Sequence, residues 1–328
     1  MNTHRYFLLF CLGCLTVATS LSANVYLSLN NKNEAGRWVY ECLTKKSEAV
    51  VNYDPEIIIL SGSNSLFGFS AKKLNDIYGI RTVNAAVHGG LGIDYMLYYG
   101  RKFLKEGRVF VLPLEYELYG RTTPSDTQYY QVIGYDPEYL YNLNLLYKIK
   151  FATGISFNTH RHLLTYSLWP KPKRDDGYQS KTLNLFGDET NNSPDKVTPE
   201  MLARLDTLPK KYQVNNDAWN QIVQFSQEAK EAGAKIVLAF PNIFVKSFDP
   251  HINSEFISEL KEKSKEAKIP LIGEPEDRVF YEKHVYDTRY HQNTLGQMRS
   301  TDILYQQLVN ANILQSGNSI IQPPKNME

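Results

Sequence analysis

Short aliphatic runs that alternate with helical patterns constrain the fold of this 328-residue chain more than any other feature. Continuous apolar runs of this length are typical of strands buried on both faces, and strands that alternate with helices form parallel sheets. The expected strands lie at residues 57–60, 81–84, 108–112, 235–240 and 269–272. We therefore predict an α/β fold with a three-layer, doubly wound, parallel five-stranded sheet in the flavodoxin-like order.

The alternation stops between about residues 120 and 214, where the chain is rich in Tyr, Asn, Pro and Lys. We predict a largely helical insertion here, with residues 175–198 as a mobile surface loop, inside a single α/β domain of residues 31–328.

The chain holds 23 Tyr against 15 Phe and 3 Trp. Tyrosine pairs a flat apolar ring with a polar tip, which suits saccharide-like ligands as well as cores.

Residues 1–30 form a separate apolar segment, and no charged side chain follows Arg5 within it. A helix of this length just spans the hydrocarbon core of a bilayer, so one expectation is a signal anchor that stays as a membrane-spanning helix. The other is a cleaved signal peptide, with an apolar core from Phe7 to Val17 followed by Ser20 and Ser22. Both predict a body on the extracytoplasmic side, periplasmic or at the cell surface.

Composition excludes several classes of function. The 36 Lys and Arg balance 35 Asp and Glu, so no basic field attracts nucleic acid. The three cysteines, Cys11, Cys14 and Cys42, exclude a disulfide framework and a cysteine-based zinc site. Neither a phosphate-binding loop nor a dinucleotide fingerprint is present in the sequence. We expect no metal and no cofactor.

Ser63 is the first candidate for chemistry. It follows the first predicted strand by three residues, in a turn with Gly62, and we expect it at the start of a helix. Backbone N–H groups there could stabilise an oxyanion. The alternative is that Ser61, Ser63 and Ser65 only cap that helix.

Asp287 and His291 form the second candidate. A carboxylate one turn before a histidine can orient the imidazole and stabilise its charged form, so that the ring serves as base for a serine. In the alternative, Asp287 and Asn293 cap the last helix and His291 is a surface residue.

Taken together, three segments of the chain resemble the SGNH/GDSL hydrolase superfamily. They are Ser61-Gly62-Ser63-Asn64, the segment from Asn84 to Gly89, and the terminal Asp-x-x-x-His. More narrowly, the chain is similar to a membrane-anchored, cell-envelope branch with the D-alanine transfer protein of teichoic acid synthesis and alginate O-acetyltransferases. The resemblance covers about residues 55–114 and 235–308. It implies Ser63 as nucleophile, His291 as general base, Asp287 as orienting acid, and Gly89 with the Ser63 backbone as oxyanion donors. It also implies a multi-pass membrane protein as acyl donor.

The chain departs from that pattern in three places. First, Ser65 is the alternative nucleophile if it, and not Ser63, occupies the position of the family's serine in the turn. Second, the acid lies four residues before the histidine, whereas three residues are usual in the superfamily. Leu114-Glu115-Tyr116 stands where a Gly-x-Asn-Asp block is expected, so an asparagine donor to the oxyanion is missing unless Asn64 or another group supplies it. We expect Glu115 to position a substrate hydroxyl or pair with an arginine, and His88 to contact substrate.

The resulting prediction is a cell-envelope serine enzyme, an O-acyltransferase or esterase, that acts on a polysaccharide or other glycan through an acyl-serine intermediate. It predicts a contact of about 2.6–3.2 Å between Ser63 Oγ and the His291 ring. The alternative is a catalytically silent, membrane-anchored glycan-binding or assembly protein that keeps the fold.

Overall fold

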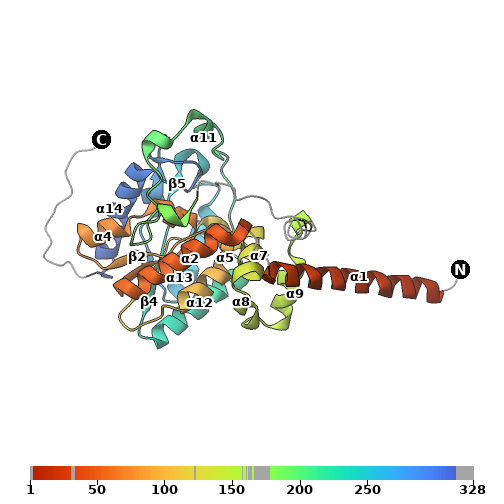
Figure 1. Ribbon diagram of the computed structural model, residues 1–328. Coiled ribbons are helices and arrows are strands. Elements are labelled where there is room, and N and C mark those ends of the chain that lie inside the picture. The colour runs from red at the N-terminus through yellow and green to blue at the C-terminus, as the bar shows by residue number, and fades with distance from the viewer. Residues whose placement is uncertain are drawn as a thin grey trace. The chain divides into compact units, whose positions relative to one another are not determined.

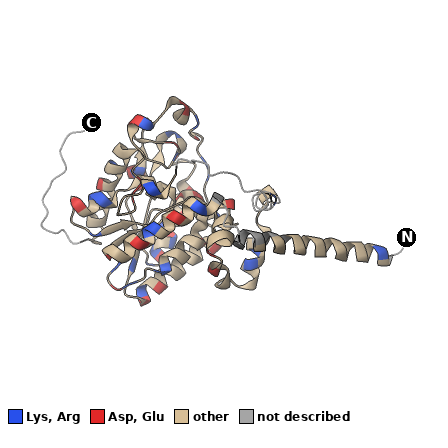
Figure 2. Ribbon diagram, in the orientation of Figure 1, with Lys and Arg blue, Asp and Glu red and all other residues tan. Residues whose placement is uncertain are grey.

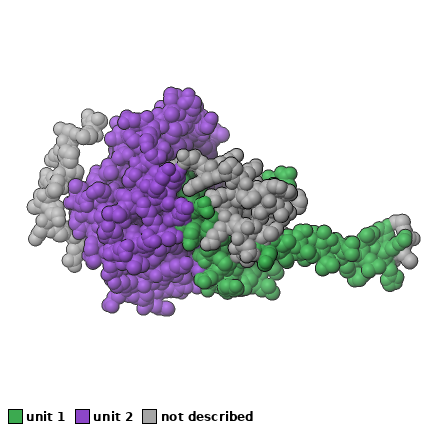
Figure 3. All heavy atoms as spheres, viewed as in Figure 1, with its two compact units in different colours: residues 1–40, 123–178 green, residues 41–122, 179–328 purple. Residues whose placement is uncertain are grey.

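The computed structural model describes residues 3–30, 34–121, 123–156, 158, 159, 161, 165 and 178–314. The chain divides into two compact units, coloured green and purple in Figure 3. Unit 1 comprises Met1–Tyr40 with Thr123–Tyr178, and unit 2 comprises Glu41–Thr122 with Gln179–Glu328. The strands and the candidate site all belong to unit 2.

Unit 1 is helical where it is described. It holds α1 (Thr3–Asn30), the start of α2 (Glu34–Tyr53), α7 (Asp126–Tyr135), α8 (Glu138–Tyr141) and α9 (Leu145–Thr153). Side-chain caps fix where two of these helices begin: Ser125 accepts from the N–H of Gln128 in α7, and Asn144 from that of Tyr147 in α9. Stacked rings hold the helices together, with Tyr40 4.8 Å from Tyr135 and Tyr129 5.5 Å from Phe151.

Helix α1 carries charge only near its first turn, at Arg5, and is otherwise uncharged (Figure 2). Large apolar side chains are exposed along it: Phe7, Leu8, Leu9, Phe10, Leu12, Leu15 and Val17. Thr16 and Thr19 interrupt this run, and their hydroxyls donate to the carbonyls of Leu12 and Leu15. Of the residues that the structure describes, none belong to a helix with the length and apolarity that a membrane crossing needs. The membrane-spanning helix predicted for residues 1–30 therefore finds no support.

Unit 2 is built on a parallel sheet whose five strands run in the order β2-β1-β3-β4-β6. Figure 1 labels β2 and β4 of this sheet. The strands are β1 (Ile57–Ile59), β2 (Thr82–Asn84), β3 (Val109–Leu112), β4 (Lys235–Ala239) and β6 (Leu271–Ile272). Ile58 lies opposite Val83 on one side and Phe110 on the other, so β1 is central among the first three strands. The predicted α/β fold, its parallel sheet and its strand order are confirmed.

Side chains alternate between the two faces of the sheet, and helices bury both faces. The first face carries Ile57, Ile59, Val111 and Val237, which pack with Leu304 and Leu308 in one core cluster. Helices α3 (Ser63–Gly68), α4 (Ala71–Asp76) and α14 (Thr294–Asn310) supply this layer. On the second face Phe110 meets Phe225 edge-on at 5.5 Å, from a layer formed by α5 (Gly92–Arg101) and α12 (Asn216–Glu231).

Smaller elements complete unit 2. Strands β5 (Ile243–Phe244) and β7 (Val279–Phe280) form a separate two-stranded sheet that the sequence did not predict, because two residues are too few to show a period. The remaining α-helices are α6 (Tyr116–Gly120), α11 (Pro199–Ala203) and α13 (Ser254–Glu266). The 3-10 helices are η1 (Gly89–Leu91), η2 (Ser180–Thr182), η3 (Pro194–Lys196), η4 (Val245–Ser247), η5 (Pro275–Arg278) and η6 (Glu282–His284).

The segment predicted as a mobile loop contains buried polar groups in its described part. Asp188 is buried and accepts from the backbone N–H groups of Ala71 (2.7 Å) and Lys72 (2.9 Å) at the start of α4. The buried Lys46 ammonium donates to the carbonyls of Asn84 (2.8 Å) and Gly187 (2.6 Å). Burial raises the pKa of Asp188 and lowers that of Lys46 to about 8. The prediction of a surface loop is wrong here, because the segment fills the end of β2 and caps α4.

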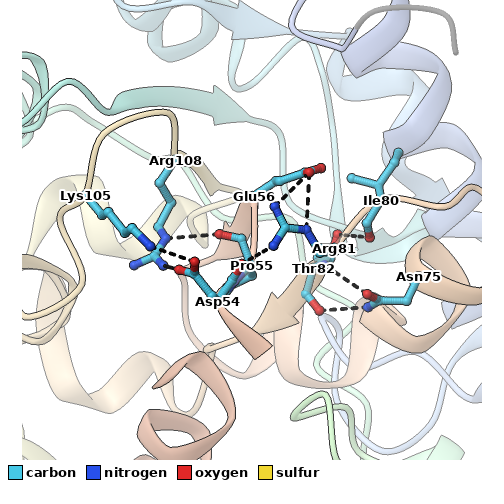
Figure 4. A network of polar contacts seen from close by, with 9 residues as sticks. All are labelled: Asp54, Pro55, Glu56, Asn75, Ile80, Arg81, Thr82, Lys105 and Arg108. Atoms are coloured by element: carbon cyan, nitrogen blue, oxygen red, sulfur yellow. Dashed lines mark hydrogen bonds and ion pairs between the residues drawn. The ribbon is translucent and has the colours of Figure 1, made fainter. Parts of the chain in front are cut away.

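A polar network holds the amino ends of the first three strands (Figure 4). Arg108 donates to the Pro55 carbonyl (3.1 Å) and the Asp54 carboxylate (2.6 Å), and Lys105 also binds Asp54 (2.6 Å). Arg81 pairs with Glu56 at 3.0 Å. These contacts lie before the strands, at the opposite edge from the residues that follow them.

Removal of the Phe225 ring tests how much the core on this face of the sheet contributes to the stability of the fold. Phe225 is fully buried against Phe110, so we expect Phe225→Ala to lower the free energy of unfolding by about 3–5 kcal/mol. Val51→Ala, at an exposed position of α2, is the control and should change it by less than about 0.5 kcal/mol. Urea denaturation measures both, and equal losses would contradict the assigned core.

Candidate active site

Three chain segments meet at the carboxyl edge of the sheet. The turn from Ser61 to Asn64 follows β1, His88 and Gly89 follow β2, and Glu115 follows β3. Because β1 lies between β2 and β3 and all three are parallel, their carboxyl ends share one edge, with the Ser63 turn in the middle. Ligands of doubly wound sheets bind beyond this edge.

Of the three serine hydroxyls in the turn after β1, that of Ser63 is the one solvent can reach. Ser63 is partly exposed and is the first residue of α3. Ser65 is fully buried, and its Oγ has no hydrogen-bond partner among the described residues. The buried Ser61 hydroxyl donates to the Pro113 carbonyl at 2.6 Å. The geometry therefore favours Ser63 over Ser65 as a nucleophile.

Glu115 is buried directly beneath this turn. Its carboxylate accepts hydrogen bonds from the N–H groups of Gly62 (3.2 Å) and Asn64 (3.0 Å), the two neighbours of Ser63. Burial raises the pKa of this carboxyl, although the backbone N–H groups act in the opposite sense. The expected pairing of Glu115 with an arginine is not found in the described part of the chain, since its oxygens face the backbone of the turn.

The turns after β1 and β2 approach so closely that both need glycine. A Cβ at Gly62 would overlap the Glu115 carboxylate and lie 2.6 Å from Gly89 Cα. A Cβ at Gly89 would lie 3.3 Å from Glu115 Oε1, a milder conflict. Glu115 and the two glycines thus form one packed unit, and each strand contributes one member.

Two backbone N–H groups at this edge have no acceptor among the described residues, those of Ser63 and Gly89. Both are the first residues of helices, where N–H groups lack a partner inside the helix. Asn64 does not add a third donor, because its Nδ2 donates to the Pro113 carbonyl (2.5 Å) and to Ser61 Oγ (3.1 Å). The two hydrogen bonds of the Asn64 amide group therefore hold it at Ser61 and at Pro113, which follows β3.

His88 lies beside these donors and is held in one tautomer. Its Nδ1 accepts from the N–H of Gly90 at 2.8 Å, so the proton of the neutral ring sits on Nε2. Burial, reinforced by His291 and Arg121, lowers the pKa of His88 to about 4. The ring is neutral at physiological pH. Arg121 donates to the Gly89 carbonyl at 2.7 Å and so fixes the neighbouring peptide.

His291 and Asp287 lie together in the loop before α14. The Tyr286 N–H donates to the His291 carbonyl (2.9 Å), which closes the loop around the pair. His291 Nδ1 lies 2.7 Å from Asp287 Oδ1, and the imidazole is buried. In the tautomer that carries its proton on Nδ1, this nitrogen donates to Asp287. Asn293, by contrast, caps α14 by accepting from the Gly296 N–H at 3.1 Å.

Phe67 connects the histidine to the helix that begins at Ser63. Its ring stacks on the His291 imidazole, with centroids 4.2 Å apart and planes 16° from parallel. Phe67 is four residues after Ser63, and residues so spaced lie on one side of a helix. The imidazole therefore packs on the side of α3 from which Ser63 projects. The short contact predicted between the Ser63 hydroxyl and the His291 ring stays a prediction.

Phe67 had no functional signal in the sequence beyond its spacing from Ser63. The same holds for the direction of Glu115, which depends on β3 lying next to β1. Among the described residues no group of three or more His, Cys, Asp or Glu side chains is arranged to hold a metal ion.

No protein-family model and no curated protein matches the chain. Among solved structures it is similar to a candidate acylhydrolase of Bacteroides fragilis NCTC 9343, with a TM-score of 0.36 and 11% identity. The match covers 79% of this chain and 88% of that one.

A methyl group at Gly62 tests the packing of the three strand ends. We expect Gly62→Ala to lower the free energy of unfolding by about 1–3 kcal/mol, because the added carbon overlaps Glu115 and presses on Gly89. Gly89→Ala should cost less, since its Cβ meets only one carboxylate oxygen. Chemical denaturation of both variants measures the order, and a milder effect at Gly62 would contradict this packing.

Proposed function

We propose that this protein is a serine acyl-ester enzyme in which Ser63, His291 and Asp287 act in sequence. The observation that carries the proposal is the Asp287–His291 pair, whose buried imidazole stacks on Phe67, four residues after Ser63. A carboxylate-oriented imidazole beside an accessible serine hydroxyl at a helix N-terminus is the arrangement that nucleophilic acyl transfer needs. Hydrogen bonds between a nucleophile and its base are often long without ligand and tighten when substrate binds.

In the first step Ser63 Oγ attacks the ester carbonyl carbon while His291 Nε2 takes the hydroxyl proton. The carbonyl oxygen becomes an oxyanion that accepts from the N–H groups of Ser63 and Gly89. When the tetrahedral intermediate collapses, the bond to the alcohol oxygen breaks and His291 returns the proton to the leaving alcohol. Asp287 stabilises the imidazolium between these two transfers.

In the second step a hydroxyl group attacks the acyl carbon while His291 Nε2 takes its proton. The bond from that carbon to Ser63 Oγ then breaks, and His291 returns the proton to Ser63. Water gives a carboxylic acid and makes the protein an esterase, whereas a sugar hydroxyl gives a new ester and makes it an O-acyltransferase. We favour a polysaccharide or other envelope glycan as the substrate, with a membrane protein as acyl donor in the transfer case. This preference is supported by the Tyr-rich composition and by the apolar segment that opens the chain.

A second candidate is a catalytically silent glycan-binding or assembly protein. One observation favours it: Glu115 occupies two N–H groups next to Ser63, and no asparagine side chain is directed at the oxyanion position within the described residues. Loss of one oxyanion donor costs about 10²–10³ in rate.

Covalent labelling separates the two candidates. We expect a fluorophosphonate probe to label the wild-type protein at Ser63 and to leave Ser63→Ala unlabelled. Ser65→Ala is the matched control and should label at the wild-type rate, because its hydroxyl is buried. His291→Ala should slow labelling by at least about 10³-fold, because the base is lost.

A wild-type protein that neither labels nor cleaves 4-nitrophenyl or coumarin acetate would contradict the enzymatic function. Saccharide binding that survives a combined Ser63→Ala and His291→Ala change would then support the silent protein.

We further propose that α1 associates the protein with a lipid surface on the extracytoplasmic side. The exposed apolar side chains from Phe7 to Val17 support this, because each buried one gains about 1.5–3 kcal/mol. The full chain should co-sediment with phosphatidylglycerol–phosphatidylethanolamine vesicles, and replacement of Phe7, Leu9 and Phe10 by Ser should weaken this at least about tenfold. Full recovery of the wild-type chain in the supernatant would refute the association.

A further inference from the structure

We propose that Glu115 is a positioning residue of the nucleophile turn: its carboxylate clamps the N–H groups on both sides of Ser63 and reserves the Ser63 N–H for the oxyanion. This inference rests on the proposed acyl-ester function. It assigns to Glu115 a role that involves no contact with substrate.

The first step of the argument is the bonding pattern around Ser63. The N–H groups of Gly62 and Asn64 point to Glu115, at 3.2 and 3.0 Å, while the N–H between them has no acceptor among the described residues. The Ser63 N–H belongs to the peptide group that lies between these two anchored N–H groups. An anchor on both neighbours therefore fixes the direction of the middle one.

The second step is that Glu115 cannot move away from this position. The residue is 5% exposed, and it packs against two glycines whose missing side chains leave room for the carboxylate. Its oxygens also lie within 3.3 Å of the Ser61 hydroxyl. A carboxylate held on every side is suited to hold the turn in one geometry.

The third step is the chemistry of the side chain. An ionised carboxylate accepts only, so it satisfies two N–H donors at once. The amide of Gln can offer one oxygen, and its NH2 group would face the second N–H as donor against donor. Glu115→Gln keeps the size of the side chain and removes one arm of the clamp.

We expect Glu115→Gln to lower kcat for ester hydrolysis about 10–100-fold with KM changed less than about threefold, because orientation at the reacting centre is lost and substrate contacts are kept. Glu115→Asp, which remains an acceptor, should recover part of that loss. Hydrogen–deuterium exchange of peptides spanning residues 60–67 should show faster exchange of the Gly62 and Asn64 amides in the Gln variant.

Asp188→Asn is the matched control. Asp188 is also a buried carboxylate that accepts two backbone N–H groups at a helix start, but it caps α4 and lies outside the catalytic residues. We expect it to lose stability as Glu115→Gln does while keeping kcat within about threefold of wild type. An equal loss of kcat in both variants would overturn the positioning role.

The outcomes separate the two proposals. A wild-type protein without labelling at Ser63 or esterase activity refutes the proposed function, while faster exchange at Gly62 and Asn64 in Glu115→Gln would still establish the clamp on the turn. An active wild type whose kcat and exchange are both unchanged by Glu115→Gln refutes the clamp alone.

Discussion

The hydrogen bonds from the turn after β1 to the buried Glu115 carboxylate are the interaction on which the site depends. Bonds to a charged group contribute about 1.5–3 kcal/mol each, and they offset the cost of placing a carboxylate out of water. They also join the end of β3 to the end of β1. Gly62 is required because a side chain there would occupy the space of that carboxylate, whereas a Cβ at Gly89 would only crowd it.

The two edges of the sheet serve different purposes. At the amino edge, Arg81 pairs with Glu56 and Lys105 with Asp54, all largely exposed, and such pairs add little to stability. At the carboxyl edge the polar groups are buried and each has a defined direction, as in Ser61, Asn64 and Glu115. The stability of the sheet comes from its apolar faces, so the carboxyl edge can hold polar groups whose geometry serves chemistry.

The sequence predicted those features that depend on local spacing. Aliphatic runs gave the five parallel strands and their order, and the four-residue interval predicted that Asp287 and His291 could meet, as they do at 2.7 Å. It could not predict contacts between strand ends far apart in the chain. Glu115 was expected to face substrate or an arginine, and residues 175–198 were expected to be a surface loop. The pairing of Glu115 with an arginine is not found among the described residues, and the segment around Asp188 is buried. A polar composition does not reveal that Glu115 and Asp188 each find two backbone N–H groups to bind.

The presence of a carboxylate at this place limits which groups could stabilise an oxyanion in the proposed reaction. An asparagine can donate to an oxyanion, whereas an ionised Glu115 only accepts, and Asn64 donates elsewhere. Within the described residues the Ser63 and Gly89 N–H groups remain. His88 lies beside them, with its Nδ1 accepting from the Gly90 N–H. A neutral imidazole can donate to an oxyanion without the cost of burying a positive charge, and the lowered pKa of His88 keeps it neutral. The cost of burying the Glu115 carboxylate is offset by the Gly62 and Asn64 N–H groups and by the Ser61 hydroxyl that bind it.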